Sequence, residues 1–212
     1  MQRWTHNRSL PHLRGLLATT PNYAIWDDHD YGPNNSGWDF WNKEQATQAF
    51  TIFNGNPSAG LPDLPGIFTF FNYGDVNFYL LDNRFYRNGQ DSLEAFDREK
   101  DLLGKEQVDW LISSMKYWQG QSRSYPANFN MVCIGNTVLS DNGLSENYAL
   151  YYNKEWQYLI DRIMAEGIDG VVFLSGDVHF SEVSVFEATG GGEPGRDRPG
   201  AGQPGEGNAG EG

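Results

Sequence analysis

Three carboxylates surround one histidine near the start of the chain, in the stretch AIWDDHDYGPNN at positions 24–35. The tetrapeptide Asp27–Asp30 follows a short apolar run over 23–26 that predicts a strand. Adjacent like charges repel each other, so packing alone gives no reason to gather these carboxylates. A bound cation would remove the cost of bringing them together. The stretch therefore predicts a metal-dependent site around His29.

Two later strand patterns end in the same kinds of residue. Val171–Ser175 reads as a buried strand that leads into Asp177 and His179, and Phe129–Ile134 reads as a strand that leads into Asn136. In open α/β sheets ligands bind beyond the carboxyl ends of the strands, so these side chains can converge. Carboxylate and amide oxygens suit hard cations, and imidazole adds affinity for transition metals. The candidate metal ligands are Asp28, Asn136, Asp177 and His179.

Each candidate also has an ordinary structural explanation. An asparagine after a glycine, as at Asn136, is typical of a turn, and Asp177 could simply cap a helix. Arg84 follows a predicted strand end and could hold a phosphoryl oxygen in a charge-assisted contact, or it could pair with Asp82 instead. The neighbouring pair Asn34-Asn35 could reach a cation, although its sequence favours a turn.

Composition limits the possible functions. The 212 residues, 39% of them hydrophobic, suffice for one globular core. A net charge of −13 argues against a nucleic-acid-binding surface and against broad attraction to anionic membranes. The single Cys133 lies in an apolar run and is expected to act as a small buried hydrophobe. No transmembrane segment is expected, and the opening lacks the apolar region of a signal peptide, which favours a cytoplasmic chain or a missing natural start.

Helical and strand patterns alternate along the chain, which is typical of an α/β fold. Ser9 is expected to begin a helix as its N-cap. The other expected elements are helices over Lys43–Phe53, Lys105–Trp118 and Trp156–Met164, a hairpin of Ile67–Phe71 with Val76–Leu81, and a further strand over Ser181–Phe186.

The composition changes at the end of the last predicted strand. Residues 187–212 are rich in glycine and proline and carry no aliphatic side chain larger than alanine. Such a segment cannot bury enough apolar surface to order itself, so it predicts a disordered tail. A shifted reading frame or a gene boundary is the alternative explanation. The predicted domain therefore covers residues 1–186.

Three motifs in order, WDDHDYGPNN, LDNRFYR and FLSGDVHFSE, give the chain a resemblance to the PhoD-like branch of the calcineurin-type metallophosphoesterases. The resemblance covers residues 1–186 and corresponds to the later part of such a catalytic domain. It implies a four-layer αββα sandwich that hydrolyses phosphomonoesters or phosphodiesters of small molecules or lipids. It also implies bound metals, calcium and iron in this branch with manganese or zinc as alternatives, and a secreted or periplasmic parent protein.

The resemblance also implies roles for individual residues. Asp28 resembles a metal-ligand position, and His29 resembles the histidine that faces the phosphate and protonates the leaving oxygen. Asp30 would orient His29, and Asn136 stands where the family has a metal ligand after a core strand. In the implied mechanism a metal-activated hydroxide attacks phosphorus in line.

The last motif and the start of the chain depart from the commoner family pattern. Asp177 and His179 resemble the last ligand pair, with Asp177 replacing a histidine, which favours a harder metal. Met1–Thr20 contains no Asp, Glu or Cys, so the early aspartates of the family have no counterpart. The sequence thus predicts a sheet that lacks its N-terminal half, at most one weakly bound metal, and poor or no turnover of phosphate esters. The alternatives are a catalytically incompetent fragment and a non-catalytic relative that binds a cation or a partner.

Overall fold

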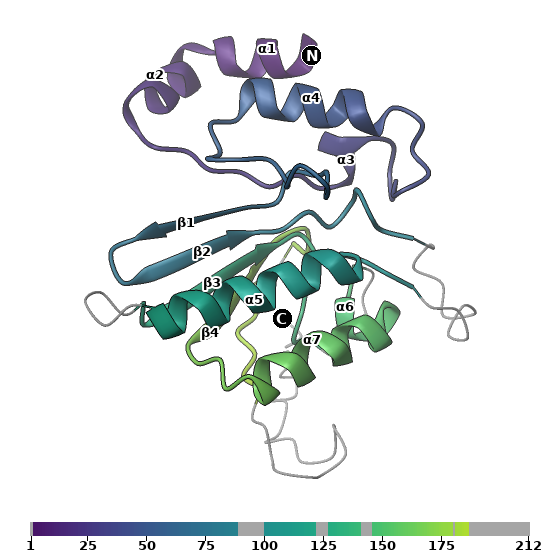
Figure 1. Ribbon diagram of the computed structural model, residues 1–212. Coiled ribbons are helices and arrows are strands. Elements are labelled where there is room, and N and C mark those ends of the chain that lie inside the picture. Colours follow the sequence, from purple (N-terminus) through teal and green to yellow (C-terminus); the bar gives the residue numbers. More distant parts are fainter. Residues whose placement is uncertain (1, 89–99, 122–126, 141–145, 180, 187–212) are drawn as a thin grey trace, which may run out of the picture.

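A computed structural model describes residues 2–88, 100–121, 127–140, 146–179 and 181–186 (Figure 1). The predicted tail over 187–212 lies outside these residues. No helix in the described ranges is both long and apolar enough to span a bilayer.

One four-stranded sheet, in the order β1-β2-β3-β4, is the centre of the described structure (Figure 1). β1 (Thr69–Tyr73) and β2 (Val76–Leu80) form the expected antiparallel hairpin, whose turn places Gly74 at a φ of 62°. β3 (Phe129–Ile134) and β4 (Val171–Ser175) each run parallel to the preceding strand in the sheet. Three strands therefore end at the same edge of the sheet.

Two long helices pack on the sheet and against each other. α5 (Lys105–Gln121) and α7 (Asn153–Ala165) contribute apolar side chains at helical spacing, and the short α6 (Tyr148–Tyr151) precedes α7. Their buried faces meet inward-facing residues of β2 and β3. This apolar core includes Tyr79, Leu102, Leu103, Val108, Leu111, Ile112, Met115, Val132, Ile134, Leu159 and Ile160.

A second, aromatic cluster holds the N-terminal part together. α1 (Gln2–Ser9), α2 (Pro11–Thr19) and α4 (Lys43–Phe53) gather on the β1 side of the molecule, with the single turn of α3 (Asp28–Tyr31) beside them (Figure 1). The Trp26 ring packs edge-on against Phe50 of α4, with 5.3 Å between ring centroids, and against Tyr31 at 4.9 Å. These contacts fix the segment that carries the DDHD tetrapeptide.

The α/β class is confirmed, and so are the expected helices at α4, α5 and α7, but the strand expected over Tyr23–Trp26 is wrong. This segment is extended without pairing to a strand, because the side chain of Asn56 takes the place of a partner. The Asn56 amide accepts a hydrogen bond from the Ala24 N–H at 3.0 Å and donates to the Ala24 carbonyl at 2.7 Å. Local hydrogen bonding of this kind competes with a sheet ladder.

Two smaller expectations also fail. Ser9 ends α1 and donates its hydroxyl to the His6 carbonyl, while Leu10 is the N-cap of α2 and makes no side-chain cap. Residues 181–186 form no strand, and Val183 and Val185 are exposed.

Candidate functional site

The loops that follow β2, β3 and β4 meet at one edge of the sheet. The N–H of Leu81 donates to the Cys133 carbonyl at 2.9 Å, and the N–H of Gly176 donates to the Gly135 carbonyl at 3.4 Å. The carboxyl ends of parallel strands thus bring together segments more than ninety residues apart. This is the convergence that the strand-end residues predicted.

Asp82 anchors the DDHD segment to this edge. Its fully buried carboxylate accepts hydrogen bonds from the Trp26 indole at 2.7 Å and from the backbone N–H groups of Ile67, Arg84 and Phe85. Burial raises the pKa of Asp82, although these four donors oppose that shift. Asp82 is therefore a structural acid that ties residue 26 to the turn after β2. It contacts the backbone of Arg84 in these hydrogen bonds, whereas the guanidinium of Arg84 pairs with other acids.

Asp28 lies buried at the start of α3 with both carboxylate oxygens occupied. Oδ1 accepts the N–H of His29 at 2.7 Å, and Oδ2 accepts the N–H of Asn35 at 3.1 Å. Burial would raise the pKa of Asp28, but the Asn35 N–H, the charge of Arg84 and the neighbouring His29 outweigh burial and lower it. Asn34 and Asn35 lie in a turn, the structure that their sequence favoured.

His29 and Asp30 are exposed on α3. The hydrogen bonds of the described residues include none between the His29 imidazole and Asp30, so an orienting role for Asp30 stays a prediction. Partial desolvation of the carboxyl group, together with the charges of Asp27 and Asp28, raises the pKa of Asp30. An exposed imidazole beside these acids is free to meet a substrate from solvent.

Asp177 and His179 follow β4 and are also exposed. Desolvation raises the pKa of Asp177, and the negative charges of Asp27 and Asp28 raise it further, against the opposing charges of Arg84 and His179. The acids of the DDHD segment therefore interact electrostatically with Asp177, which follows the carboxyl end of β4. Asp177 also has a φ of 66°, an uncommon backbone conformation for a residue other than glycine.

Beneath these acids, five polar side chains form a closed hydrogen-bonded ring. Asn83 Nδ2 donates to Asp27 Oδ1 at 3.1 Å and to Asn136 Oδ1 at 2.7 Å. Asn136 Nδ2 donates to Glu146 Oε2 at 2.7 Å, and Arg84 closes the ring with Nη2 to Glu146 at 3.2 Å and Nε to Asp27 at 2.5 Å. We call these residues, Asp27, Asn83, Arg84, Asn136 and Glu146, the polar ring.

The polar ring is almost completely shielded from solvent. Asn83, Arg84 and Asn136 are 0% exposed and Glu146 is 5% exposed, whereas the side chain of Asp27 is 25% exposed. Arg87 also joins the carboxylate of Glu146, with Nη1 at 2.8 Å and Nη2 at 3.2 Å. Two guanidinium groups thus face two carboxylates, which is the pairing that buried charges require.

Gly135 provides the space in which two members of the polar ring lie. A Cβ at this position would stand 2.5 Å from Asn83 Nδ2 and 2.8 Å from Asp27 Oδ2. Since real Cβ atoms do not approach other atoms so closely, only glycine permits this arrangement. The glycine of the GNT sequence after β3 is therefore part of the site's construction.

The structure places Asn136 and Arg84 in the buried ring and the other candidate residues nearer the surface. Asn136 already binds Asn83 through Oδ1, so a cation would have to use the second lone pair of that oxygen. The substrate-binding role of Arg84 stays a prediction, because its guanidinium is enclosed by Asp27 and Glu146, while Nη1 has no hydrogen-bond partner among the described residues.

The donor types at this edge fit a hard cation, but the acids alone do not enclose one. Across the described ranges, no group of three or more His, Cys, Asp or Glu side chains could hold a metal ion. The negative charges of Asp27 and Asp28 raise the pKa of Asp177. A cation bound among such carboxylates would neutralise their charge and reduce the repulsion between them. Asp28, Asp177 and His179 are not gathered into a group that could hold a metal in this structure, so their role as ligands stays a prediction.

Three residues of the edge were not assigned from sequence. Asn83 stands three residues after the end of β2, and continuing the register of β2 and β3 sets it opposite Asn136, so the strand-end rule would have found it. Asp27 belongs to the recognised tetrapeptide but was given no role. Glu146 carries no sequence signal, because it does not follow a predicted strand, and it has a φ of 63°.

Comparison with known proteins identifies relatives of this chain. Residues 1–198 match the PhoD-like phosphatase family. Alkaline phosphatase D of Bacillus subtilis (strain 168) is 28% identical over 209 residues, which are 86% of this chain and 35% of that protein. A solved structure described as the structure of PhoD aligns with a TM-score of 0.64 at 26% identity, covering 82% of this chain and 37% of the other. The chain spans little more than a third of the length of these relatives.

Proposed function

The chain belongs to the PhoD-like phosphatase family, and from this premise we propose that it carries part of a metal-dependent phosphoric ester hydrolase site. The observation that supports this function most strongly is the meeting of two acidic segments at one sheet edge. Asp177 after β4 feels the charges of Asp27 and Asp28, and the exposed His29 stands directly beside them. The proposed domain is residues 1–186.

In the proposed site Asp28, Asn136, Asp177 and His179 hold the cation, with calcium or iron preferred and manganese or zinc as substitutes. When bound, the cation supplies positive charge that stabilises phosphoryl oxygens and makes water a better nucleophile. Asp28 is suited to this role because two backbone N–H groups fix its carboxylate and favour its ionised form. Arg84 adds a fixed positive charge behind the acids.

His29 is the proposed general acid. Its backbone N–H is tied to Asp28, so the residue keeps its place on α3 while the imidazole remains exposed to a substrate. In the proposed mechanism the imidazole donates a proton to the leaving oxygen as the bond from phosphorus to that oxygen breaks. Both monoesters and diesters present such an oxygen.

The test is hydrolysis of an aryl phosphate monoester and the matching diester, with calcium, iron, manganese or zinc added in turn. We expect slow, metal-stimulated turnover that falls about 100-fold or more in His29→Ala, because a positioned acid contributes at least that factor. His12→Ala, which removes an exposed histidine of α2, is the matched control and should keep the full rate. Equal rates in the two variants would refute the role of His29, and metal binding without turnover would favour a non-catalytic cation site.

A further inference from the structure

Glu146 is one of two carboxylates in the polar ring, the other being Asp27, and as a carboxylate it can only accept hydrogen bonds. Its carboxylate takes donors from Asn136, from Arg84 and, through both oxygens, from Arg87. A carboxylate and an amide differ in this respect, because an amide offers a donor and an acceptor and can turn over. A neighbouring amide must therefore point its NH₂ group, and not its oxygen, at the Glu146 carboxylate.

The neighbouring amide is that of Asn136. Because Glu146 Oε2 accepts Nδ2 of Asn136 at 2.7 Å, the oxygen of that amide must face the other way, toward Asn83. Asn83 then gives one proton of its NH₂ group to Asn136 and the other to Asp27. The hydrogen bond at Glu146 thus sets the orientation of the Asn136 and Asn83 amides, and through them the position of the partly exposed Asp27 carboxylate.

We propose that Glu146 is a positioning residue, which fixes the Asn136 amide with its oxygen toward Asn83 and, through Asn83, fixes Asp27 beside the candidate site. The proposal rests on the proposed function for its consequence in metal binding, but the orientation of Asn136 can be measured without any metal. Arg84 and Arg87 hold the carboxylate of Glu146 in place, and the loop after β3 holds its backbone, since the Thr137 N–H donates to the Glu146 carbonyl at 3.0 Å.

The first test follows the side-chain NH₂ signals of Asn136 by NMR in the metal-free chain. In the wild type we expect these protons to exchange slowly with solvent, because they are buried and bound to a carboxylate. In Glu146→Gln we expect faster exchange and a shifted signal. Glu155→Gln, which replaces another buried acid outside the ring, is the control and should leave the signal unchanged. A folded Glu146→Gln variant with wild-type Asn136 signals would overturn the proposal.

A compensating pair keeps the proposal testable if Glu146→Gln folds poorly. Asn136→Asp alone sets two carboxylates against each other where the hydrogen bond was 2.7 Å long, so its melting temperature should fall. Adding Glu146→Gln restores one donor and one acceptor to that contact, because the amide at position 146 can donate to the carboxylate at position 136. The double variant should melt above Asn136→Asp. A double variant that is no more stable than Asn136→Asp would show that the contact does not orient either group.

The consequence for the site is measured with Mn²⁺ as the probe. Loss of a group that orients a ligand typically weakens metal affinity by about 10-fold or more, so Glu146→Gln should bind Mn²⁺ at least that much more weakly than Glu155→Gln. Unchanged Mn²⁺ affinity in a variant with altered Asn136 signals would overturn the link to the site. If the wild type binds no Mn²⁺, the proposed metal chemistry fails, while the NMR signals still decide the role of Glu146.

Discussion

The two buried regions beside the sheet are built on opposite principles. The core between the sheet and helices α5 and α7 is apolar, and its buried acid Glu155 accepts the backbone N–H groups of Leu102 and Leu103 and the hydroxyl of Tyr148. The polar ring at the strand ends consists only of charged groups and amides, arranged around Gly135. The apolar core drives folding through burial, whereas the ring holds side chains in fixed orientations next to the candidate site.

The largest effect on stability is expected in the core. Leu111 of α5 is completely buried, so Leu111→Ala should lower the free energy of unfolding by about 2–5 kcal/mol. Leu16→Ala, which shortens an exposed leucine of α2, is the control and should change it little. Urea unfolding measures both. Where the Leu111 variant still folds, it should keep the Mn²⁺ affinity of the wild type, and a matching loss of affinity would mean that core and ring are not separable.

The buried Glu155 makes the stability of the core depend on pH. Burial raises the pKa of Glu155 to about 7, despite three donors that oppose the shift. The unfolded chain releases this proton near pH 4.5 while the folded chain keeps it, so the free energy of unfolding should fall as pH rises from 4.5 to 7, by about 3 kcal/mol. Above pH 7 both states are ionised and this contribution stays constant.

Urea unfolding of the wild type and of Glu155→Gln, at pH 5 and pH 8, checks this prediction. The difference between the two pH values should be smaller in the variant, since the titrating group is gone. Parallel behaviour of the two proteins would assign the pH dependence to other groups.

Substitution of Gly135 is expected to lower the free energy of unfolding less than Leu111→Ala does, but to weaken metal binding at the candidate site more. Gly135→Ala forces a methyl group against Asn83 and Asp27, so we expect a loss of about 1–3 kcal/mol and weaker Mn²⁺ binding. Gly15→Ala is the matched control, because a Cβ there meets nothing within 4 Å and the residue lies in α2. That control should gain up to about 1 kcal/mol from helix propensity. Equal Mn²⁺ affinity in both variants would show that the ring does not position the site.

The sequence predicted those parts of the molecule in which a periodic apolar pattern decides the structure. Helix α7 and strands β3 and β4 follow directly from such patterns. That Asn136 and Asp177 share one site stays a prediction, although the strands that lead into them are neighbours in the sheet. The pattern was misleading over Tyr23–Trp26, because the Asn56 side chain satisfies the backbone there. No local pattern distinguishes an extended segment bound by a side chain from one bound by a strand.

The polar ring was the least predictable feature, for a physical reason. Its contacts depend on which polar groups are buried together once the sheet is formed. Glu146 does not follow a predicted strand, and its own backbone is left-handed. Sequence indicated the kinds of atoms at the site, in Asp28, Asp177 and His179. It did not indicate that Arg84 would be enclosed by acids instead of lying open to a phosphoryl group.

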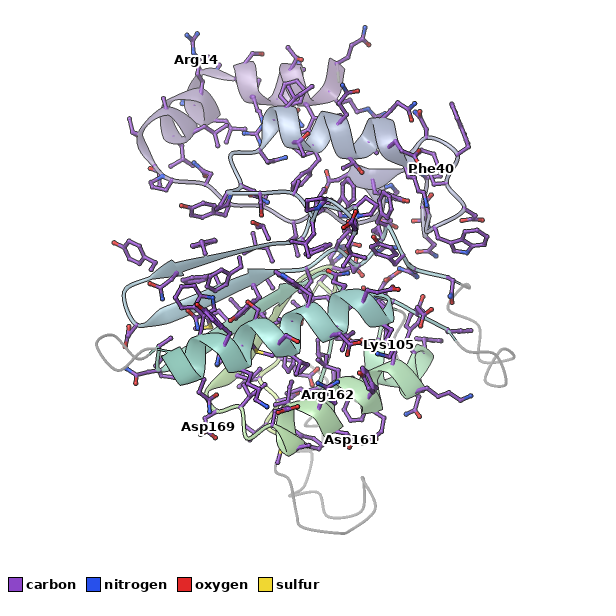
Figure 2. All side chains as sticks on the ribbon, viewed as in Figure 1. Arg14, Phe40, Lys105, Asp161, Arg162 and Asp169 are labelled. Carbon is purple, nitrogen blue, oxygen red and sulfur yellow. The ribbon has the colours of Figure 1, made fainter. Side chains whose placement is uncertain are left out.

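The most direct test of the account is the binding of Mn²⁺ to the chain, followed by electron paramagnetic resonance, in two variants that each remove one exposed aspartate. Asp177 lies at the carboxyl end of β4, and Asp169 lies in the loop before the amino end of that strand (Figure 2). The account predicts binding that weakens at least tenfold in Asp177→Asn and is unchanged in Asp169→Asn. Binding that is equal in the wild type and both variants, or absent from the wild type, would contradict a cation site at the strand ends.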